Sequence, residues 1–172
     1  METCIGKSKS FIISVPIGLL SVKSCEKGLH NVKFKHFDAN FNHEVKIQDD
    51  DENPSIPLLE LEKYLKRYFS KLSPNSLEEY ICWSKVCKPG SFSENVLRKL
   101  IEINFSEIIT YKNLAILSGN ANSQRAVGSV MRKNAICIVI PCHRVINSNN
   151  KIGNYNGGVE IKKWLLDFEA LK

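Results

Sequence analysis

The sequence predicts a two-part α/β protein, in which a small antiparallel sheet with one helix is followed by a mostly helical part. Two observations lead to this prediction. Short segments rich in β-type residues are confined to about the first 34 positions, and helical spacing of apolar residues takes over from Pro57 onward. The run from Lys88 to Ser91 contains proline and glycine, the two strongest structure breakers. We therefore expect one domain over residues 1–88 and a second over residues 89–172.

The composition limits the classes of protein to be considered. The chain has 172 residues, of which 43% are hydrophobic, enough for one large domain or two small ones. No terminal stretch resembles a signal peptide and no apolar run is long enough to cross a bilayer, so we expect a soluble intracellular protein without a membrane partner. In that setting the six cysteines are expected to be thiols, metal ligands or a nucleophile rather than disulfides.

The excess of positive charge is concentrated in the second half. Residues 1–88 carry 13 Lys and Arg against 12 Asp and Glu, whereas residues 89–172 carry 11 against 6. Such an imbalance favours a polyanionic partner, with an affinity that falls as the salt concentration rises. A basic surface without any partner is the alternative, and charge alone does not decide between the two.

Three short segments, residues 11–15, 19–24 and 29–34, predict the strands of the small sheet. Gly28 supplies a turn between the last two, which are therefore predicted to form a hairpin. The acidic run at residues 49–52 is expected to be a solvated loop. A helix should begin at Pro57, and the residues that would form its buried stripe are Leu58, Leu61, Leu65, Tyr68 and Leu72.

Three helices are predicted in the first part of the second domain. Apolar residues at helical spacing over residues 92–105 outline the first. Thr110 and Ser123 suit the caps of a second helix, over residues 111–117, and of a third that reaches Lys133. Because a glycine-containing turn joins the last two, they predict a helix-turn-helix, with an ordinary helical hairpin as the alternative.

Reactive chemistry is expected at Cys142, which follows an apolar run and the dihedral-locking Pro141. A cysteine is strongly nucleophilic only as the thiolate, so a neighbouring base would raise its reactive fraction. His143 is the candidate base, but side chains adjacent in sequence diverge, so we expect a water between the two. Glu169 would fix the tautomer of the imidazole. The alternative is a buried structural cysteine beside a surface histidine.

Further segments of the second half form a specific pattern together with this pair. They are Thr110-Tyr111-Lys112-Asn113-Leu114-Ala115, Arg125-Ala126-Val127-Gly128, Met131-Arg132-Lys133-Asn134, Ile140-Pro141-Cys142-His143-Arg144-Val145 and Gly153-Asn154-Tyr155-Asn156-Gly157-Gly158. The pattern resembles one family, the O6-alkylguanine-DNA alkyltransferases, also called methylated-DNA-protein-cysteine methyltransferases. The resemblance runs without a gap from Tyr111 to Glu169 and extends more loosely across most of the chain.

The resemblance implies a ribonuclease H-like first domain, a winged-helix-like second domain and a defined reaction. Cys142 would remove the alkyl group from O6-methylguanine in DNA and keep it, so each polypeptide would act once and need no cofactor for the transfer. A relay of Cys142, water, His143 and Glu169 would generate the thiolate. The resemblance leaves open whether O4-methylthymine is also a substrate.

The same resemblance assigns roles to other residues near the site. Tyr111 would donate toward the departing guanine, Asn134 would hold the active-site turn through hydrogen bonds, and Lys162 would lie close by. The second helix of the helix-turn-helix would enter the minor groove, where Arg125 would fill the gap left by a flipped nucleotide. The residues implied to contact DNA or the flipped base are Arg125, Ala126, Gly128, Arg132, Val145, Tyr155 and Asn156. The expected partner is double-stranded DNA containing O6-alkylguanine, and a nuclear monomer is expected.

A metal site is implied by resemblance to the amino-terminal zinc ligands of animal members of the family. Cys4, Cys25 and His30 match three of these ligands, and a structural zinc normally takes four. The family's fourth ligand is a histidine in a region where this chain has none, so Cys82 is the expected substitute, with Cys87 as second choice. Cysteines packed in the core are the alternative to zinc.

Two other functions remain open at this level. A non-catalytic sensor of alkyl lesions would use the same pocket, but such proteins lack the nucleophile that Cys142 provides. A cysteine hydrolase would use Cys142, His143 and Glu169 on acyl groups, but it would not need Tyr111, Arg125 or a helix-turn-helix.

Overall fold

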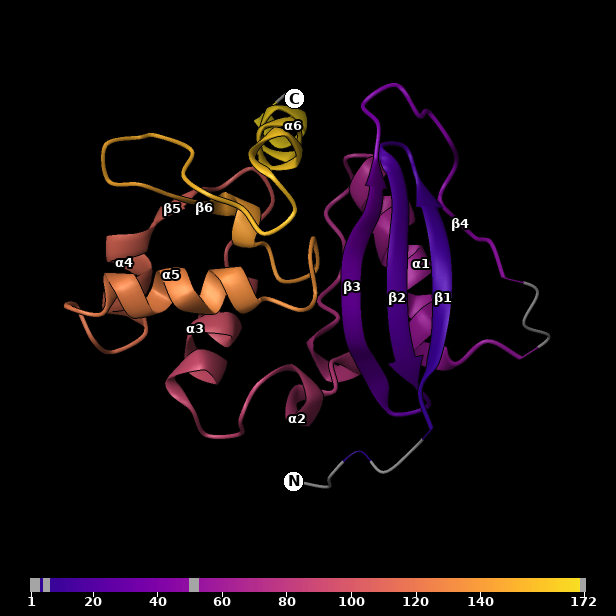
Figure 1. Ribbon diagram of the computed structural model, residues 1–172, viewed down its shortest axis with the longest axis horizontal. Helices are drawn as coiled ribbons and strands as arrows, with labels where there is room; N and C mark the ends of the chain where they lie inside the picture. Colours follow the sequence, from indigo (N-terminus) through magenta and orange to yellow (C-terminus); the bar gives the residue numbers. More distant parts are fainter. Residues whose placement is uncertain (1–3, 5–6, 50–52, 171–172) are drawn as a thin grey trace. The chain divides into compact units, whose positions relative to one another are not determined.

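The computed structural model describes residue 4, residues 7–49 and residues 53–170 of the chain (Figure 1). The chain divides into two compact units, residues 1–86 and residues 87–172. The predicted order, an antiparallel sheet with a helix followed by a mostly helical part, is confirmed. Among the described residues, no helix is both long enough and apolar enough to span a membrane.

The first unit contains a four-stranded antiparallel sheet with the strand order β3-β2-β1-β4. Its strands are β1 (Lys9–Val15), β2 (Gly18–Cys25), β3 (Gly28–Phe37) and the short β4 (Lys46–Ile47). The three long strands lie where the β-type segments predict them, whereas β4 is only two residues long and has no alternation that would predict it. Of the expected acidic loop, residues 50–52 lie outside the described residues, and Asp49 accepts a hydrogen bond from the backbone N–H of Ile12.

Helix α1 (Ile56–Phe69) packs against the sheet (Figure 1). Pro57 lies in its first turn, as predicted, and its missing N–H costs nothing there. The helix ends at Phe69, because Lys71 adopts a positive φ of 56° that is incompatible with helical geometry. Leu72 therefore lies beyond the helix with 53% of its surface exposed, and the expectation that it extends the buried stripe is wrong.

The chain returns to the sheet through η1 (Glu78–Tyr80) and the single-turn α2 (Trp83–Val86). The backbone N–H of Cys82 donates to the carbonyl of Leu29, at the start of β3, at 3.0 Å. Gly28 permits this approach, because a Cβ there would lie only 2.8 Å from the backbone nitrogen of Cys82 and from the carbonyl oxygen of Tyr80. Cys82 is thereby held beside the β2–β3 hairpin.

The second unit is mostly helical. Its elements are α3 (Phe92–Ile101), β5 (Ile109–Thr110), α4 (Tyr111–Leu117), α5 (Gln124–Lys133), η2 (Cys142–Arg144), β6 (Val145–Ile146) and α6 (Val159–Ala170). The predicted helix over residues 92–105 ends at Ile101, so Phe105 lies outside it. Ser106 has a positive φ of 69°, which marks the turn between α3 and β5.

Helices α4 and α5 form the predicted helix-turn-helix pair. Thr110 caps α4 as expected, since its Oγ1 accepts a hydrogen bond from the backbone N–H of Asn113 at 3.1 Å. Ser123 does not cap α5 through its side chain, and that expectation is wrong. Its Oγ donates backward to the carbonyl of Asn120 at 2.6 Å, which stabilises the turn instead of the helix.

Candidate active site

Cys142 lies at the start of η2, directly after a buried apolar turn. The run over residues 135–140 is largely buried, as predicted, but it forms a turn and not a strand. Ile138 has a positive φ of 67°, which is strained for a β-branched residue. Pro141 follows, and Cys142 is only 4% exposed. The sulfur is thus delivered by a tightly folded segment and not by a flexible loop.

Two very short strands bring the two halves of the site together. β5 and β6 pair in parallel, with Ile109 opposite Val145 and Thr110 opposite Ile146. Tyr111, the first residue of α4, follows β5 directly, and η2 directly precedes β6. The pairing therefore places the start of the helix-turn-helix beside the segment that carries Cys142.

The side chain of Asn134 organises the turn before Cys142. Its Nδ2 donates to the Sγ of Cys142 at 3.0 Å and to the carbonyl of Ile140 at 2.9 Å, and its Oδ1 accepts from the N–H of Ile136 at 3.0 Å. Asn134 is itself 3% exposed. One amide thus pairs two backbone groups of a buried turn and also contacts the sulfur.

Behind the sulfur lies a buried group of three charged or titratable side chains. The Nε2 of His143 lies 2.7 Å from Oε1 of Glu169, on α6. Arg144 donates to both oxygens of the same carboxylate, each at 2.9 Å. Because an ionised carboxylate only accepts, the proton of the neutral imidazole must lie on Nε2, and Nδ1 is left as the basic atom. Nδ1 has no hydrogen-bond partner among the described residues.

Burial and hydrogen bonds shift the pKa values of these groups in different directions. Burial raises the pKa of Cys142, although Asn134 and the charge of Lys162 oppose the shift. Burial lowers the pKa of His143 against the opposing effect of Glu169. Burial acts to raise the pKa of Glu169, but the hydrogen bonds from His143 and Arg144 outweigh it and hold the value well below the usual range. The resting site therefore contains a thiol, a neutral imidazole and a carboxylate.

Lys162 is fully buried on α6, next to the same site. Its Nζ donates to the carbonyl of Val145 at 2.6 Å and lies 5.9 Å from the ring centroid of Tyr111. Burial lowers the pKa of Lys162 to about 8, against the opposing effect of Cys142. At neutral pH this lysine is still mostly protonated, and its charge favours the thiolate form of Cys142.

Cys142 opens into a cleft of about 570 Å³ between α5 and the loop that precedes α6. A cleft of this size suits a small-molecule or nucleobase ligand. The residues that line it are Tyr111, Lys112, Gln124, Arg125, Gly128, Met131, Arg132, Cys142, Asn147, Ser148, Gly153, Asn154, Tyr155 and Asn156. Most of the predicted DNA-contacting residues are among them. Ala126 is exposed on α5 without lining the cleft, and Val145 is fully buried in β6.

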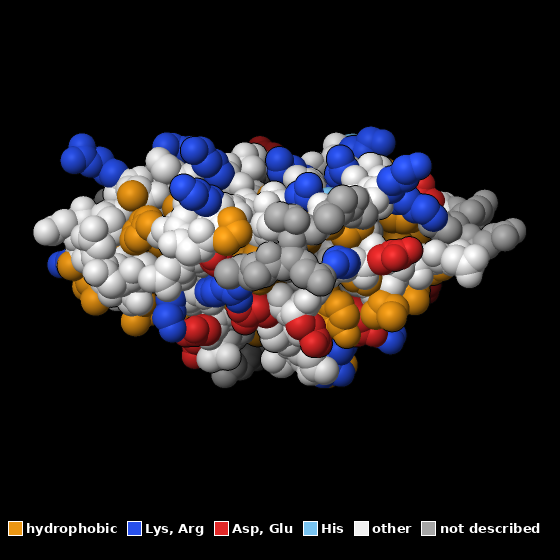
Figure 2. Space-filling view, turned by 90° about the horizontal axis from the view of Figure 1, so that it is seen from below, with side chains coloured by type: hydrophobic (Ala, Val, Ile, Leu, Met, Phe, Trp, Pro, Cys, Tyr) orange, Lys and Arg blue, Asp and Glu red, His pale blue; other side chains and the backbone are white. Residues whose placement is uncertain are grey.

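Basic side chains are exposed on and around this cleft. Arg125, Arg132 and Lys133 of α5 and Lys112 of α4 are all exposed. Lys and Arg side chains, with scattered acidic groups, are visible on the surface drawn in Figure 2. The cleft that contains the nucleophile therefore carries positive charge, which suits a polyanion.

Comparison with known proteins identifies the family. Residues 91–171 match the family model described as 6-O-methylguanine DNA methyltransferase, DNA binding domain. The chain is 38% identical over 168 residues to the human methylated-DNA–protein-cysteine methyltransferase, which covers 94% of this chain and 80% of the human one. The chain belongs to the methylated-DNA–protein-cysteine methyltransferase family. The protein of the same name from Cricetulus griseus is 35% identical over 185 residues, covering 99% of this chain and 85% of its own.

The similarity to solved methyltransferase structures extends over most of the chain. The crystal structure of Mycobacterium tuberculosis OGT in complex with DNA matches with a TM-score of 0.70 and 26% identity, covering 92% of this chain and 91% of that chain. The likeness includes the sheet of the first unit as well as the helices of the second.

Several residues of this methyltransferase site carry no sequence signal of their own. Arg144 is inside the family motif, but nothing in its position predicts that its side chain would be 4% exposed and paired with Glu169. The backbone N–H of Ser106, 63 positions from Glu169, also donates to that carboxylate at 3.2 Å. Lys112 lies within the family motif that begins at Thr110. Gln124 and Asn147 had no signal.

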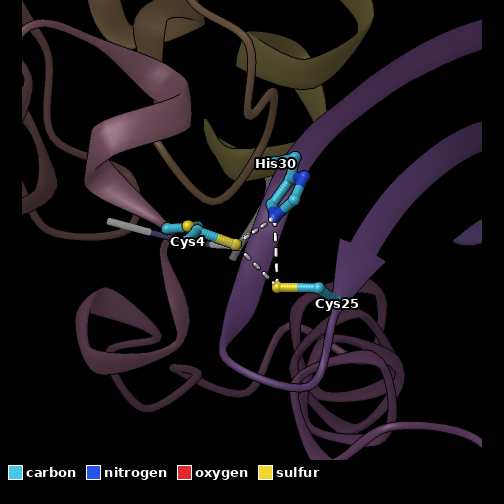
Figure 3. Close-up of side chains that lie close together, drawn as sticks. Cys4, Cys25 and His30 are labelled. Carbon is cyan, nitrogen blue, oxygen red and sulfur yellow. Dashed lines mark hydrogen bonds between the residues drawn. The ribbon is translucent and has the colours of Figure 1, made fainter. Parts of the chain in front are cut away.

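The described part of this methyltransferase also contains a Cys/His cluster, in the first unit. The ligand atoms of Cys4, Cys25, His30 and Cys82 all lie within 4.8 Å of one another. Figure 3 shows Cys4, Cys25 and His30 pointing toward one another, with separations of 3.2 Å between the two sulfurs and of 3.1 and 3.4 Å from Nε2 to them. Cys87, the second choice for a fourth ligand, is not part of the cluster.

The chemistry of this donor set fits a tetrahedral metal ion. Three thiolates and one imidazole are a common zinc set, and tetrahedral zinc–sulfur bonds would place the sulfurs about 3.7 Å apart. Burial, followed by the charges of Lys85 and Lys23, lowers the pKa of His30, so its imidazole is held in the neutral form that binds metals. The four side chains therefore form a possible metal site.

Proposed function

We propose that this protein repairs O6-alkylguanine in double-stranded DNA by transferring the alkyl group to the Sγ of its own Cys142. The observation that carries the proposal is the position of that sulfur. It lies in a cleft flanked by the basic helix α5, and the acid–base residues His143 and Glu169 lie behind it. Kinship with full-length methyltransferases supports the same reaction.

The transfer is a displacement at saturated carbon. The thiolate of Cys142 forms a bond to the alkyl carbon, the bond between that carbon and O6 breaks, and its electron pair remains on guanine. The thiol proton passes through a water to Nδ1 of His143, and Glu169 stabilises the resulting imidazolium. Because the resting thiol is neutral and buried, the nucleophile forms only when this proton has an acceptor.

Tyr111 is the donor to the departing base in this mechanism. Its ring lines the cleft, and burial, followed by the charge of Cys142, raises the pKa of its hydroxyl. The phenol therefore keeps its proton at neutral pH and transfers it to guanine as negative charge develops there, and the phenolate that is left recovers a proton through water. Guanine then leaves as a neutral molecule.

A base inside a duplex does not reach a buried sulfur, so the target nucleotide must rotate out of the stack. Arg125 is exposed at the rim of the cleft, on the helix proposed to enter the minor groove. Its guanidinium would occupy the space left in the duplex and offset part of the stacking free energy that is lost. Tyr155 and Asn156 would form the opposite wall around the flipped base.

The product is a thioether, which water does not cleave at neutral pH. Among the described residues that line the cleft, Cys142 is the one cysteine, so no second thiol is in place to receive the alkyl group. We therefore expect one transfer per polypeptide, carried out by a monomer.

Since the substrate is DNA, the proposed place of action is the nucleus, which a fluorescent fusion in the source cells would test.

The decisive experiment is intact-mass analysis after mixing the protein with a duplex that contains O6-methylguanine. The expected result is a mass gain that corresponds to one methyl group replacing one proton, located by peptide mapping at Cys142. Cys142→Ala should bind the duplex and gain no mass. Cys137→Ala is the matched control, because Cys137 is also buried but does not line the cleft, and it should react normally. A methyl group on any other residue contradicts the proposal.

We further propose that the Cys4, Cys25, His30 and Cys82 cluster holds a structural zinc ion. Bound zinc would cross-link the N-terminal segment, the β2–β3 hairpin and the segment before α2. Protein purified without chelators should contain one zinc per chain, and Cys82→Ser should lower that content while Cys87→Ser leaves it unchanged. Equal zinc content in all three proteins would contradict the assignment of Cys82.

A further inference from the structure

The guanidinium of Arg144 is fixed by hydrogen bonds that its position in the motif does not predict. It is held at two places that are far apart in sequence. On one side it forms the two hydrogen bonds to Glu169, and on the other its Nη1 donates to the carbonyl of Ile103, after α3, at 2.7 Å. The side chain is buried, and so are Glu169 and the His143 imidazole that bonds to the same carboxylate.

We infer that Arg144 is a positioning residue for the transfer, which holds the Glu169 carboxylate in place as the ionised acceptor for Nε2 of His143. The inference rests on the proposed function, because it assigns Arg144 a task within that reaction. Arg144 does not touch the cleft and acts only through Glu169 and His143.

The physical need for such a residue follows from burial. An unpaired carboxylate in an apolar interior carries a large desolvation cost, so without Arg144 the cation that pairs with Glu169 would be a protonated His143. A protonated His143 could no longer accept the thiol proton on Nδ1. Arginine suits this task because its guanidinium stays charged at all relevant pH values and matches both carboxylate oxygens.

The charge of Arg144 also affects His143 directly. The charged or titratable groups around this imidazole are Glu169 and Lys162 on α6 and Arg144 and Cys142 on η2. Glu169 raises the pKa of His143, whereas Arg144 and Lys162 lower it. Removing the positive charge at position 144 should therefore raise the pKa of His143, so that the imidazole is protonated, and unable to accept the thiol proton, over a wider range of acidic pH.

A double-mutant cycle on the single-turnover transfer rate tests the inference, with Arg144→Gln, Glu169→Gln and the double variant. Arg144→Gln should slow transfer by about 10- to 100-fold, the range typical of residues that orient a functional group. If Arg144 acts through Glu169, the double variant should be no slower than Glu169→Gln alone. Rate losses that multiply would overturn the inference. In Arg144→Gln the acidic limb of the pH–rate profile should also move to higher pH.

Arg144→Lys covers the case in which the glutamine variant does not fold. It keeps the charge but not the two-pronged contact, so it should transfer more slowly than the wild type with the acidic limb in its original place. A wild-type rate in Arg144→Lys, together with an unshifted profile, would overturn the inference. The proposed function is judged separately, by methylation of Cys142 in the wild-type protein.

Discussion

The side-chain amide of Asn134 lies 3.0 Å from the Sγ of Cys142 and donates a hydrogen bond to it, while it also fixes the turn that precedes the cysteine. A donor to sulfur stabilises the thiolate more than the thiol, so this contact lowers the pKa of Cys142 against the effect of burial. Folding of the turn and activation of the nucleophile thus depend on one side chain.

Asn134→Ala should separate these two effects. Loss of the donor should raise the pKa of Cys142 further, so the increase of the transfer rate with pH should move to higher pH. The carbonyl of Ile140 and the N–H of Ile136 lose their partner, which should cost about 1–3 kcal/mol in the free energy of unfolding. Single-turnover rates over a range of about four pH units around the ordinary thiol pKa, together with denaturant unfolding, would measure both effects. An unchanged pH–rate profile would contradict the role assigned to the contact.

Lys162 should make stability depend on pH in the alkaline range. Its pKa is lowered from 10.5 to about 8 in the folded protein, so between these values the unfolded chain binds more protons. The free energy of unfolding should therefore increase by up to about 3 kcal/mol as pH rises through this window. This gain should be lost as pH falls back toward 8. Cys142, whose pKa is raised, acts in the opposite direction.

The difference between wild type and Lys162→Met isolates the lysine contribution. Chemical denaturation at several pH values should show that the variant lacks the alkaline rise. Thiol alkylation of the variant should also titrate at higher pH, because a cation near Cys142 is gone. Parallel stability curves for the two proteins would contradict the lowered pKa of Lys162.

Gly128 should be required for tight DNA binding but not for folding. It lies within α5 and lines the cleft, yet a Cβ at this position would meet no other atom of the protein within 4 Å. Gly128→Ala should therefore stabilise the helix, by about 0.5–1 kcal/mol, while it weakens binding of duplex DNA because the methyl group protrudes into the approach path. Thermal unfolding and fluorescence anisotropy with a labelled duplex measure the two effects. Equal DNA affinity in the wild type and in Gly128→Ala would contradict the proposed close approach.

Gly28 should be required for the metal site although it supplies no ligand. A Cβ at this position would meet the backbone of Tyr80 and Cys82, so Gly28→Ala should push Cys82 away from the other three side chains. The variant should lose zinc affinity much as Cys82→Ser does, and chelator should no longer lower its thermal stability. Zinc titration with a chromogenic chelator would measure the affinity. Wild-type zinc affinity in Gly28→Ala would show that the hairpin adapts.

The sequence was informative where local patterns decide the structure. Thr110 predicts the start of α4, and alternation predicts β1, β2 and β3. Leu72 and Ser123 show where local patterns fail, because a positive φ at Lys71 and a competing acceptor at Asn120 decide those positions. Neither event has a reliable signature in a single sequence.

The contacts around the nucleophile were less predictable from the sequence than the nucleophile itself. The spacing of Cys142 and His143 identifies the reactive segment, but the contacts of Glu169 with Arg144 and Ser106 depend on how α6 packs against residues far away in the chain. Val145 has a place in the motif, yet its side chain points into the core and its carbonyl supports Lys162. Such long-range contacts follow from tertiary packing, which residue spacing does not encode.

The parallel pairing of β5 with β6 has one more consequence. Among the described residues this ladder consists of two residue pairs, so it is a short connection between the start of α4 and the segment that carries Cys142. A brief opening of the β5–β6 pairing would separate Tyr111 from the sulfur of Cys142 while the surrounding helices stay folded. Amide protons of these four residues should then exchange with solvent sooner than those of the surrounding helices, and the equilibrium between the open and the paired ladder would set the fraction of molecules that is competent for transfer.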